Sequence, residues 1–231
     1  MPERSTLPAR LLLGLLLGLL GALASAASPA QRLSCSNDAR PAPTALLERF
    51  MDADCPSCWR DAQAPRPPPG ALVLDWVAPS DQGDEAALSA VALPEAAQRK
   101  QDLGLANTAR RQLSRPIARQ RVRVVQGFAF NGYLGATLAY RPRSTRPYTA
   151  WMLLVEQLPA GTEGSAVARQ LVRAAAEIRP GSLGGRPLAL SETRAFRVPE
   201  GANAEQLRVL AWVQDEHGRL LGLAQTHCPA G

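Results

Sequence analysis

The chain has 231 residues, of which 46% are hydrophobic and 20% are charged, and this composition is typical of a globular protein. It excludes an acidic disordered tail, a collagen-like repeat and a coiled coil, so one or two compact domains are expected. The formal net charge is +6, but Lys100 is the single lysine and the arginines are scattered. Without a basic tract, we do not expect a nucleic-acid partner.

The N-terminus has the pattern of a secretory signal peptide. Arg4 and Arg10 precede an apolar run at residues 11–20, and small residues follow at positions 22, 24, 25 and 26. We therefore expect a signal peptide over residues 1–26 and a periplasmic or secreted protein with no stable membrane span after cleavage. The alternative is a membrane anchor, but the 17 residues from Leu11 to Ala27 are fewer than the roughly 20 that span a bilayer.

All four cysteines follow this leader, and an oxidising compartment favours disulfides. Four cysteines allow three pairings. Cys55 and Cys58 are separated by only two residues, whereas Cys35 lies near the start of the mature chain and Cys228 near its end. The economical pairing is Cys55 with Cys58 and Cys35 with Cys228. The second bridge would stabilise the fold by roughly 4 to 5 kcal/mol in the chain-entropy model.

After a polar lead over residues 27–43, the pattern predicts a strand, a short helix and a second strand. The apolar runs at 45–51 and 71–77 have the length and content of buried strands. Between them, the sequence from Cys55 to Arg60 can begin a helix, which the prolines at 65–69 must end. This order suggests a parallel crossover unit.

The remaining elements are predicted from residue type and alternation. Helix formers at 84–113, broken by Pro94 and Gly104, predict one or two helices, and alternating residues at 121–138 predict strands. A segment rich in proline and arginine at 141–147 marks a boundary. Beyond it, strands are predicted at 148–155, 208–213 and 220–224, the last two as a hairpin, and residues 165–178 fit either a helix or a strand.

The Cys-x-x-Cys at Cys55 and Cys58 is the sharpest chemical signal. Between a strand and the start of a helix, this spacing indicates thiol–disulfide exchange, with Cys55 as the attacking thiol and Cys58 as the resolving thiol. Pro56 and Ser57 between them would tune the reduction potential, and Trp59 is a candidate contact surface. A protein thiol or disulfide is the expected partner.

Two other interpretations of the pair stay open. The first is a static local disulfide in a noncatalytic binding or structural module of the cell envelope. The second is a zinc or copper(I) site in which His227 and Cys228 join Cys55 and Cys58, although this set conflicts with a bridge from Cys35 to Cys228. The sequence has no phosphate-loop, dinucleotide or zinc-protease motif, so no cofactor and no resident metal are expected.

The segment from Glu48 to Cys58 resembles the start of the secreted, thioredoxin-like bacterial family catalogued as domain of unknown function 1223. Leu74-Asp75-Trp76 is similar to the family's second-strand motif, and residues 209–214 with 218–224 are similar to its closing hairpin. The resemblance implies an α/β fold, with a thioredoxin-like N-terminal domain over residues 44–140 and a β-rich C-terminal portion over residues 148–228.

Proteins of the thioredoxin class usually carry a cis proline before the strand that faces the cysteine pair. The matching segment here is expected to be Gln120-Arg121 before Val122, which has no proline. Pro116 is the nearest candidate and lies several residues too early.

Overall fold

The computed structural model describes residues 34–38, 40–63, 67–105 and 111–228, which all belong to one compact unit. The expected signal peptide over residues 1–26 lies outside the described residues, as does the start of the polar lead. Across the described ranges, strands in three sheets make up most of the regular structure, with two α-helices and three short 3-10 turns.

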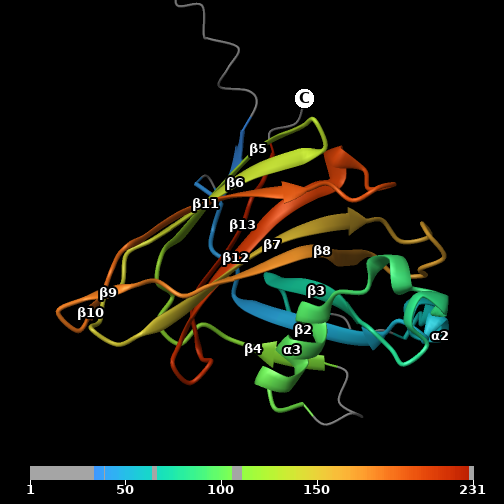
Figure 1. The fold of residues 1–231 in the computed structure, drawn as a ribbon, viewed down its shortest axis with the longest axis horizontal. Helices are drawn as coiled ribbons and strands as arrows, with labels where there is room; N and C mark the ends of the chain where they lie inside the picture. The colour runs from blue at the N-terminus through green and yellow to red at the C-terminus, as the bar shows by residue number, and fades with distance from the viewer. Residues whose placement is uncertain (1–33, 39, 64–66, 106–110, 229–231) are drawn as a thin grey trace, which may run out of the picture. The chain divides into compact units, whose positions relative to one another are not determined.

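The larger sheet has seven strands in the order β13-β12-β7-β8-β3-β2-β4 (Figure 1). Its strands are β2 (Ala45–Asp52), β3 (Ala71–Ala78), β4 (Arg111–Ser114), β7 (Tyr148–Leu158), β8 (Arg169–Ile178), β12 (Leu207–Asp215) and β13 (Leu220–Gln225). β3 runs parallel to both β2 and β8, and the other neighbouring strands are antiparallel. The sheet therefore combines strands from residues 44–140 with strands from residues 148–228.

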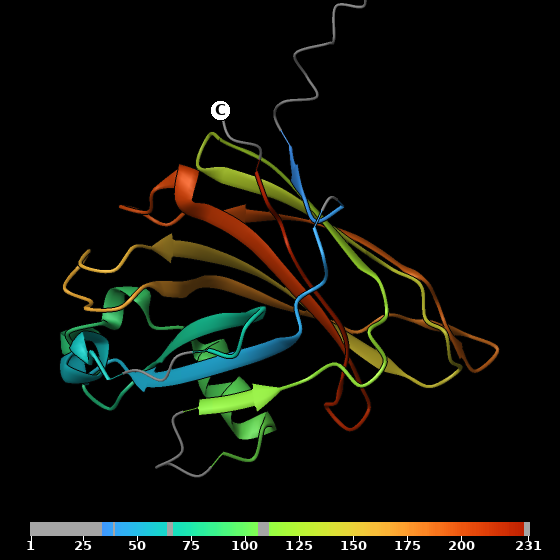
Figure 2. The ribbon, with the colours of Figure 1, turned by 180° about the vertical axis from the view of Figure 1, so that it is seen from behind.

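A second, four-stranded antiparallel sheet has the order β1-β5-β6-β11 (Figure 2). Its strands are β1 (Cys35–Ser36), β5 (Val122–Phe130), β6 (Tyr133–Tyr140) and β11 (Leu190–Arg197). A tight turn joins β5 to β6, where Asn131 and Gly132 both have positive φ angles, 49° and 76°. The short strands β9 (Ser182–Leu183) and β10 (Arg186–Pro187) form the third sheet.

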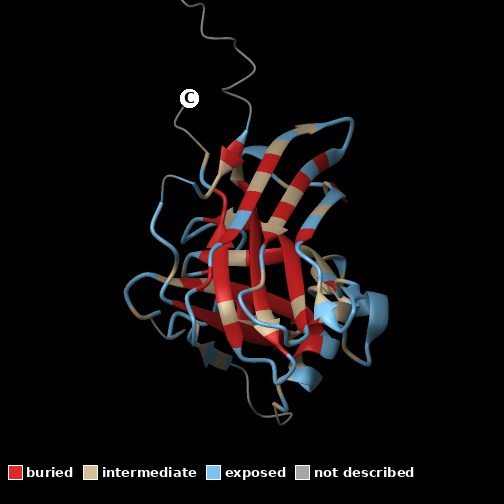
Figure 3. Ribbon diagram, turned by 90° about the vertical axis from the view of Figure 1, so that its left-hand side faces the viewer, coloured by how far each residue is buried: buried red, intermediate tan, exposed pale blue. Residues whose placement is uncertain are grey.

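Apolar residues are buried on both faces of the seven-stranded sheet. Figure 3 shows long buried stretches, in red, along its strands. On β7, Met152 and Leu154 pack with the inner residues of β5, β6 and β11, whereas Trp151 and Leu153 belong to a cluster on the opposite face. Successive side chains of a strand point to opposite faces, so burial on both faces explains the continuous apolar run at 148–155.

Helices cover only part of the sheet. The α-helices are α2 (Pro56–Arg60) and α3 (Pro94–Asp102), and the 3-10 turns are η2 (Gly83–Glu85), η3 (Ser89–Val91) and η4 (Ala204–Gln206). From α3, Ala96 joins the cluster of Trp76, Trp151 and Trp212, and Arg99 is buried beside it. In Figure 2, α2 lies at the arrowhead end of β2.

The expected α/β fold with a thioredoxin-like N-terminal domain is wrong. In the described parts of residues 84–113, the only α-helix is the nine-residue α3, and the chain then forms β4. The predicted strands at 121–138 pair in the second sheet rather than beside β2. The prediction of one or two helices in residues 84–113 is confirmed by α3, but most of the regular structure is strand in three sheets, and the pairing of those strands is what the sequence pattern does not reveal.

Several local predictions are confirmed. The strand, short helix and strand at residues 45–78 are β2, α2 and β3, with β2 and β3 parallel. The strands at 148–155, 208–213 and 220–224 are also present, and the last two pair as a hairpin. The ambiguous segment 165–178 contains the strand β8, which lies between β7 and β3.

Candidate functional site

The structure contains the two predicted disulfides, Cys35–Cys228 and Cys55–Cys58. Both are consistent with an oxidising, exported environment. Every cysteine of the chain is bonded in one of these pairs. Cys228 is therefore withdrawn from the alternative metal set with His227, Cys55 and Cys58.

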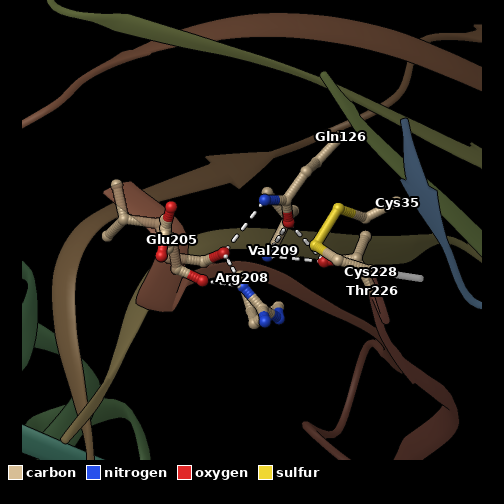
Figure 4. The surroundings of a disulfide bond; sticks show 8 residues. Cys35, Gln126, Glu205, Arg208, Val209, Thr226 and Cys228 are labelled. Atoms are coloured by element: carbon tan, nitrogen blue, oxygen red, sulfur yellow. Dashed lines mark hydrogen bonds between the residues drawn. A yellow bond between two sulfur atoms is a disulfide. The ribbon is translucent and has the colours of Figure 1, made fainter. Parts of the chain in front are cut away.

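The Cys35–Cys228 disulfide fastens β1 to the segment that follows β13 (Figure 4). Beside it, Ser36 and His227 exchange two backbone hydrogen bonds of 3.2 and 2.9 Å. The buried Gln126 side chain donates to the Leu207 carbonyl oxygen at 3.0 Å and accepts from the Val209 N–H at 2.9 Å. Cys35 pairs with Gln126 in the register of β1 and β5, and the Thr226 backbone N–H donates to the Val209 carbonyl oxygen at 2.9 Å, so both segments joined by this disulfide are also hydrogen bonded to core strands.

The Cys55–Cys58 disulfide lies where the chain leaves β2. Both cysteines are half-buried, and Pro56 occupies the first turn of α2, where its missing N–H costs no hydrogen bond. The Cys55 Sγ lies 3.5 Å from the exposed Ser57 hydroxyl. Because α2 has only five residues, a helix dipole can stabilise a Cys55 thiolate only slightly.

Arg169 of β8 binds the backbone of α2 through hydrogen bonds. It is 3% exposed and donates hydrogen bonds to the carbonyl oxygens of Trp59 and Cys58, at 2.6 and 3.2 Å, and to the Ser165 hydroxyl at 2.9 Å. Its guanidinium carbon also lies 5.2 Å from the centre of the Trp59 ring. One buried cation therefore satisfies carbonyl oxygens at the end of the helix that carries the cysteine pair.

Asp75 of β3 balances this cation. Its carboxylate is fully buried and accepts from Arg169 at 2.9 Å, from Arg49 of β2 at 2.7 Å and from the Gln170 backbone N–H at 2.9 Å. Arg49 pairs with Asp75 in the register of β2 and β3, and Asp75 pairs with Leu171 of β8. Three adjacent strands thus place a buried Arg–Asp–Arg cluster next to α2, the helix that carries Cys58.

Asp75 and Arg169 were not identified from the sequence as partners of Arg49. A usable signal was present, because Arg49 and Asp75 interrupt apolar runs that were predicted as buried strands. A charge in a buried strand requires a partner of opposite sign, so the two residues could have been matched. Arg169 gave no such signal, because its segment could not be assigned to a strand.

A cavity of about 340 Å³ adjoins α2. Apolar residues form most of its wall, including Pro56 and Trp59 of α2, Leu88 and Val91 around η3, and Leu171 of β8. Trp59, a candidate contact surface from the sequence, is 6% exposed, and its indole N–H donates to the Glu163 carbonyl oxygen at 2.7 Å. The Trp59 ring is therefore a fixed part of the cavity wall.

The strand expected to face the cysteine pair is not the one that lies beside β2. β4 pairs antiparallel with β2, matching Arg111 with Arg49, whereas Val122 begins β5 in the other sheet. Residues 106–110, which precede β4, lie outside the described residues. Among the residues that the structure describes there is no cis peptide bond.

In the described part of the chain, no group of three or more His, Cys, Asp or Glu side chains is placed to hold a metal ion. None of the helices described is long and apolar enough to cross a membrane.

Comparisons with known proteins do not assign the chain to a family. No protein-family model matches it, and no curated protein matches it. One solved structure, an endonuclease/exonuclease/phosphatase from Beutenbergia cavernae DSM 12333, aligns over 49% of this chain and 28% of its own, with 13% identity and a TM-score of 0.28. At this TM-score, the alignment indicates neither a shared fold nor a shared function.

Proposed function

We propose that this is an exported protein that carries out thiol–disulfide exchange with protein partners through Cys55 and Cys58. The observation that carries the proposal is the contrast between its two disulfides. Cys35–Cys228 joins β1 to the segment that follows β13. By contrast, Cys55–Cys58 is half-buried at the end of β2, beside an apolar cavity.

Loop size supports the same division of roles. The chain-entropy model assigns about 2 kcal/mol of stabilisation to a bridge between residues three apart, such as Cys55–Cys58. It assigns about 5 kcal/mol to a bridge between residues 193 apart, such as Cys35–Cys228. Reduction of Cys55–Cys58 therefore lowers the free energy of unfolding only slightly, as a reversible exchange requires.

The exchange proceeds in two balanced steps. A substrate thiolate attacks the Cys55 sulfur, forming a mixed disulfide and releasing Cys58 as a thiolate that takes up a proton. A second substrate thiolate then attacks the substrate sulfur of the mixed disulfide, and Cys55 leaves. The substrate loses two electrons and two protons, and the Cys55–Cys58 disulfide gains them. The reverse sequence reduces a substrate disulfide, with Cys55 as nucleophile and Cys58 as resolving thiol.

Equilibration in glutathione buffers tests the proposal, with the Cys55–Cys58 state read by mass spectrometry. We expect a reduction potential above about −300 mV and catalysed reduction of insulin. A Cys58→Ser variant should trap mixed disulfides in periplasmic extract, and the matched Cys55→Ser/Cys58→Ser variant should trap none. A potential well below −300 mV with no turnover and no trapped partner would refute exchange.

A static disulfide in a noncatalytic envelope module is the second candidate. Asp52 and Asp54 flank the pair in sequence, and a carboxylate close to Cys55 opposes its thiolate. Asp52 is only partly offset by Lys100, whose Nζ lies 3.9 Å from its carboxylate. The same titration decides between the candidates, because a static bridge stays oxidised in glutathione buffers that reduce an exchanging pair.

A further inference from the structure

Four arginines surround a second cavity, of about 430 Å³, on the four-stranded sheet. It lies at the end of the β5–β6 pair away from the tight turn. The residues that line it are Arg121, Arg123, Ala139, Tyr140, Arg141, Pro142 and Arg143. Neither disulfide contributes to its wall, so an inference drawn from it is independent of the proposed exchange activity.

The strand register explains why the arginines converge. Val122 pairs with Tyr140, and Arg123 pairs with Ala139. Because side chains alternate across a sheet, Arg121 and Arg123 lie on the face opposite the buried Val122. Ala139 lies on that same outer face and has only a methyl side chain, which leaves space beside Arg123.

Positive charge exceeds negative charge at this cavity. Asp38 contacts Arg121 at 3.3 Å and Arg123 at 2.8 Å, and its hydrogen bond with Arg123 is the main cause that holds the Asp38 pKa below its usual value. Within the described residues, no carboxylate is paired with Arg141 or Arg143. The cluster therefore carries four cations and one anion.

We propose that Arg121, Arg123, Arg141 and Arg143 form a binding site for a phosphate group. A guanidinium presents planar N–H donors that match the oxygens of a phosphate, and each charged hydrogen bond is stronger than a neutral one. A phosphate dianion nearly balances the excess of three positive charges, whereas one carboxylate balances only one. Asp38 fixes the orientation of Arg121 and Arg123 and leaves Arg141 and Arg143 to bind the ligand.

Titration calorimetry of the purified protein with inorganic phosphate at low ionic strength tests this site. We expect saturable one-to-one binding, which Arg141→Ala/Arg143→Ala weakens at least tenfold. The control Arg186→Ala/Arg197→Ala removes the same charge from exposed positions on β10 and β11 and should leave the affinity within twofold. Equal losses in both variants, or no loss in the first, would show general electrostatic attraction and overturn the proposal.

A vesicle-binding assay distinguishes two sources of the phosphate group, a lipid headgroup and a free phosphate compound. Co-sedimentation with phosphatidic acid vesicles, lost in Arg141→Ala/Arg143→Ala and absent with phosphatidylcholine alone, would assign the site to a phosphomonoester lipid headgroup. Binding of inorganic phosphate without vesicle binding would assign it to a free phosphate compound. Absence of binding to both probes would refute the site, provided that circular dichroism shows the protein to be folded.

Discussion

Adjacent residues of β2, Glu48 and Arg49, place opposite charges on opposite faces of the large sheet. Glu48 is fully buried and accepts two hydrogen bonds from Arg99 of α3, at 3.0 and 2.9 Å. Arg49 pairs with Asp75 on the face that carries Arg169. Alternation along a single strand thus gives each α-helix its own ionic anchor, with Arg99 for α3 and Arg169 for α2.

Replacing Arg169 by Gln should loosen α2 and destabilise the fold. The change leaves the buried Asp75 with one cation fewer and removes donors from the Cys58 and Trp59 carbonyl oxygens, so we expect a loss of about 3 kcal/mol in unfolding free energy. Urea denaturation measures the loss, and hydrogen exchange should quicken at amides 57–60.

The control is Arg60→Gln, which removes the same charge from an exposed position of α2. It should change the stability by less than about 0.5 kcal/mol. Equal effects of the two substitutions would contradict the role of Arg169 as the anchor.

Sequence reasoning identified the two cysteine pairs but not the residues that support them. The short spacing of Cys55 and Cys58 favoured a bond between them, and this bond left Cys35 to pair with Cys228. Arg169 reaches α2 from a strand more than 100 positions later in the chain. Local patterns carry no information about such a contact, because it depends on which strands become neighbours.

At the scale of elements, the apolar runs of the sequence form buried strands. What the runs could not predict is their pairing, since β3 lies beside β8 although 90 residues separate the end of one strand from the start of the other. The thioredoxin-like expectation failed at this step. Residues 117–121 illustrate the difficulty, because they lead to β5 while hydrogen bonding to β13 through the N–H groups of Ile117 and Gln120.

That contact requires a residue without a side chain at position 222. A Cβ added to Gly222 would meet the Gln120 carbonyl oxygen and approach a Val122 methyl carbon within 2.8 Å. We therefore expect Gly222→Ala to destabilise the protein by about 2 kcal/mol, because backbone must move to relieve the overlap.

Gly135→Ala is the matched control for thermal and urea denaturation. Gly135 lies in β6, and a Cβ there would have no atom within 4 Å. If both substitutions were tolerated equally, the close approach of residues 117–121 to β13 would be wrong.

At the scale of the whole molecule, Cys35–Cys228 joins two segments that lie 193 positions apart. We expect Cys35→Ser/Cys228→Ser to lower the unfolding free energy by about 5 kcal/mol in the chain-entropy model. Cys55→Ser/Cys58→Ser should lower it by about 2 kcal/mol or less. Denaturation under nonreducing conditions compares them, and equal losses would contradict the structural role assigned to the long bridge.

The order in which the ribosome makes these cysteines has a consequence for biogenesis. Cys35 precedes Cys55 by 20 positions, and Cys228 is synthesised last. Bringing Cys35 to Cys55 costs about 2 kcal/mol less loop-closure entropy than bringing it to Cys228. The loop from Cys55 to Cys58 is shorter still, so the same relation favours the native Cys55–Cys58 bond over a bond from Cys35 to Cys55. A chain that oxidises during synthesis therefore closes the short bridge first and leaves Cys35 to wait for Cys228.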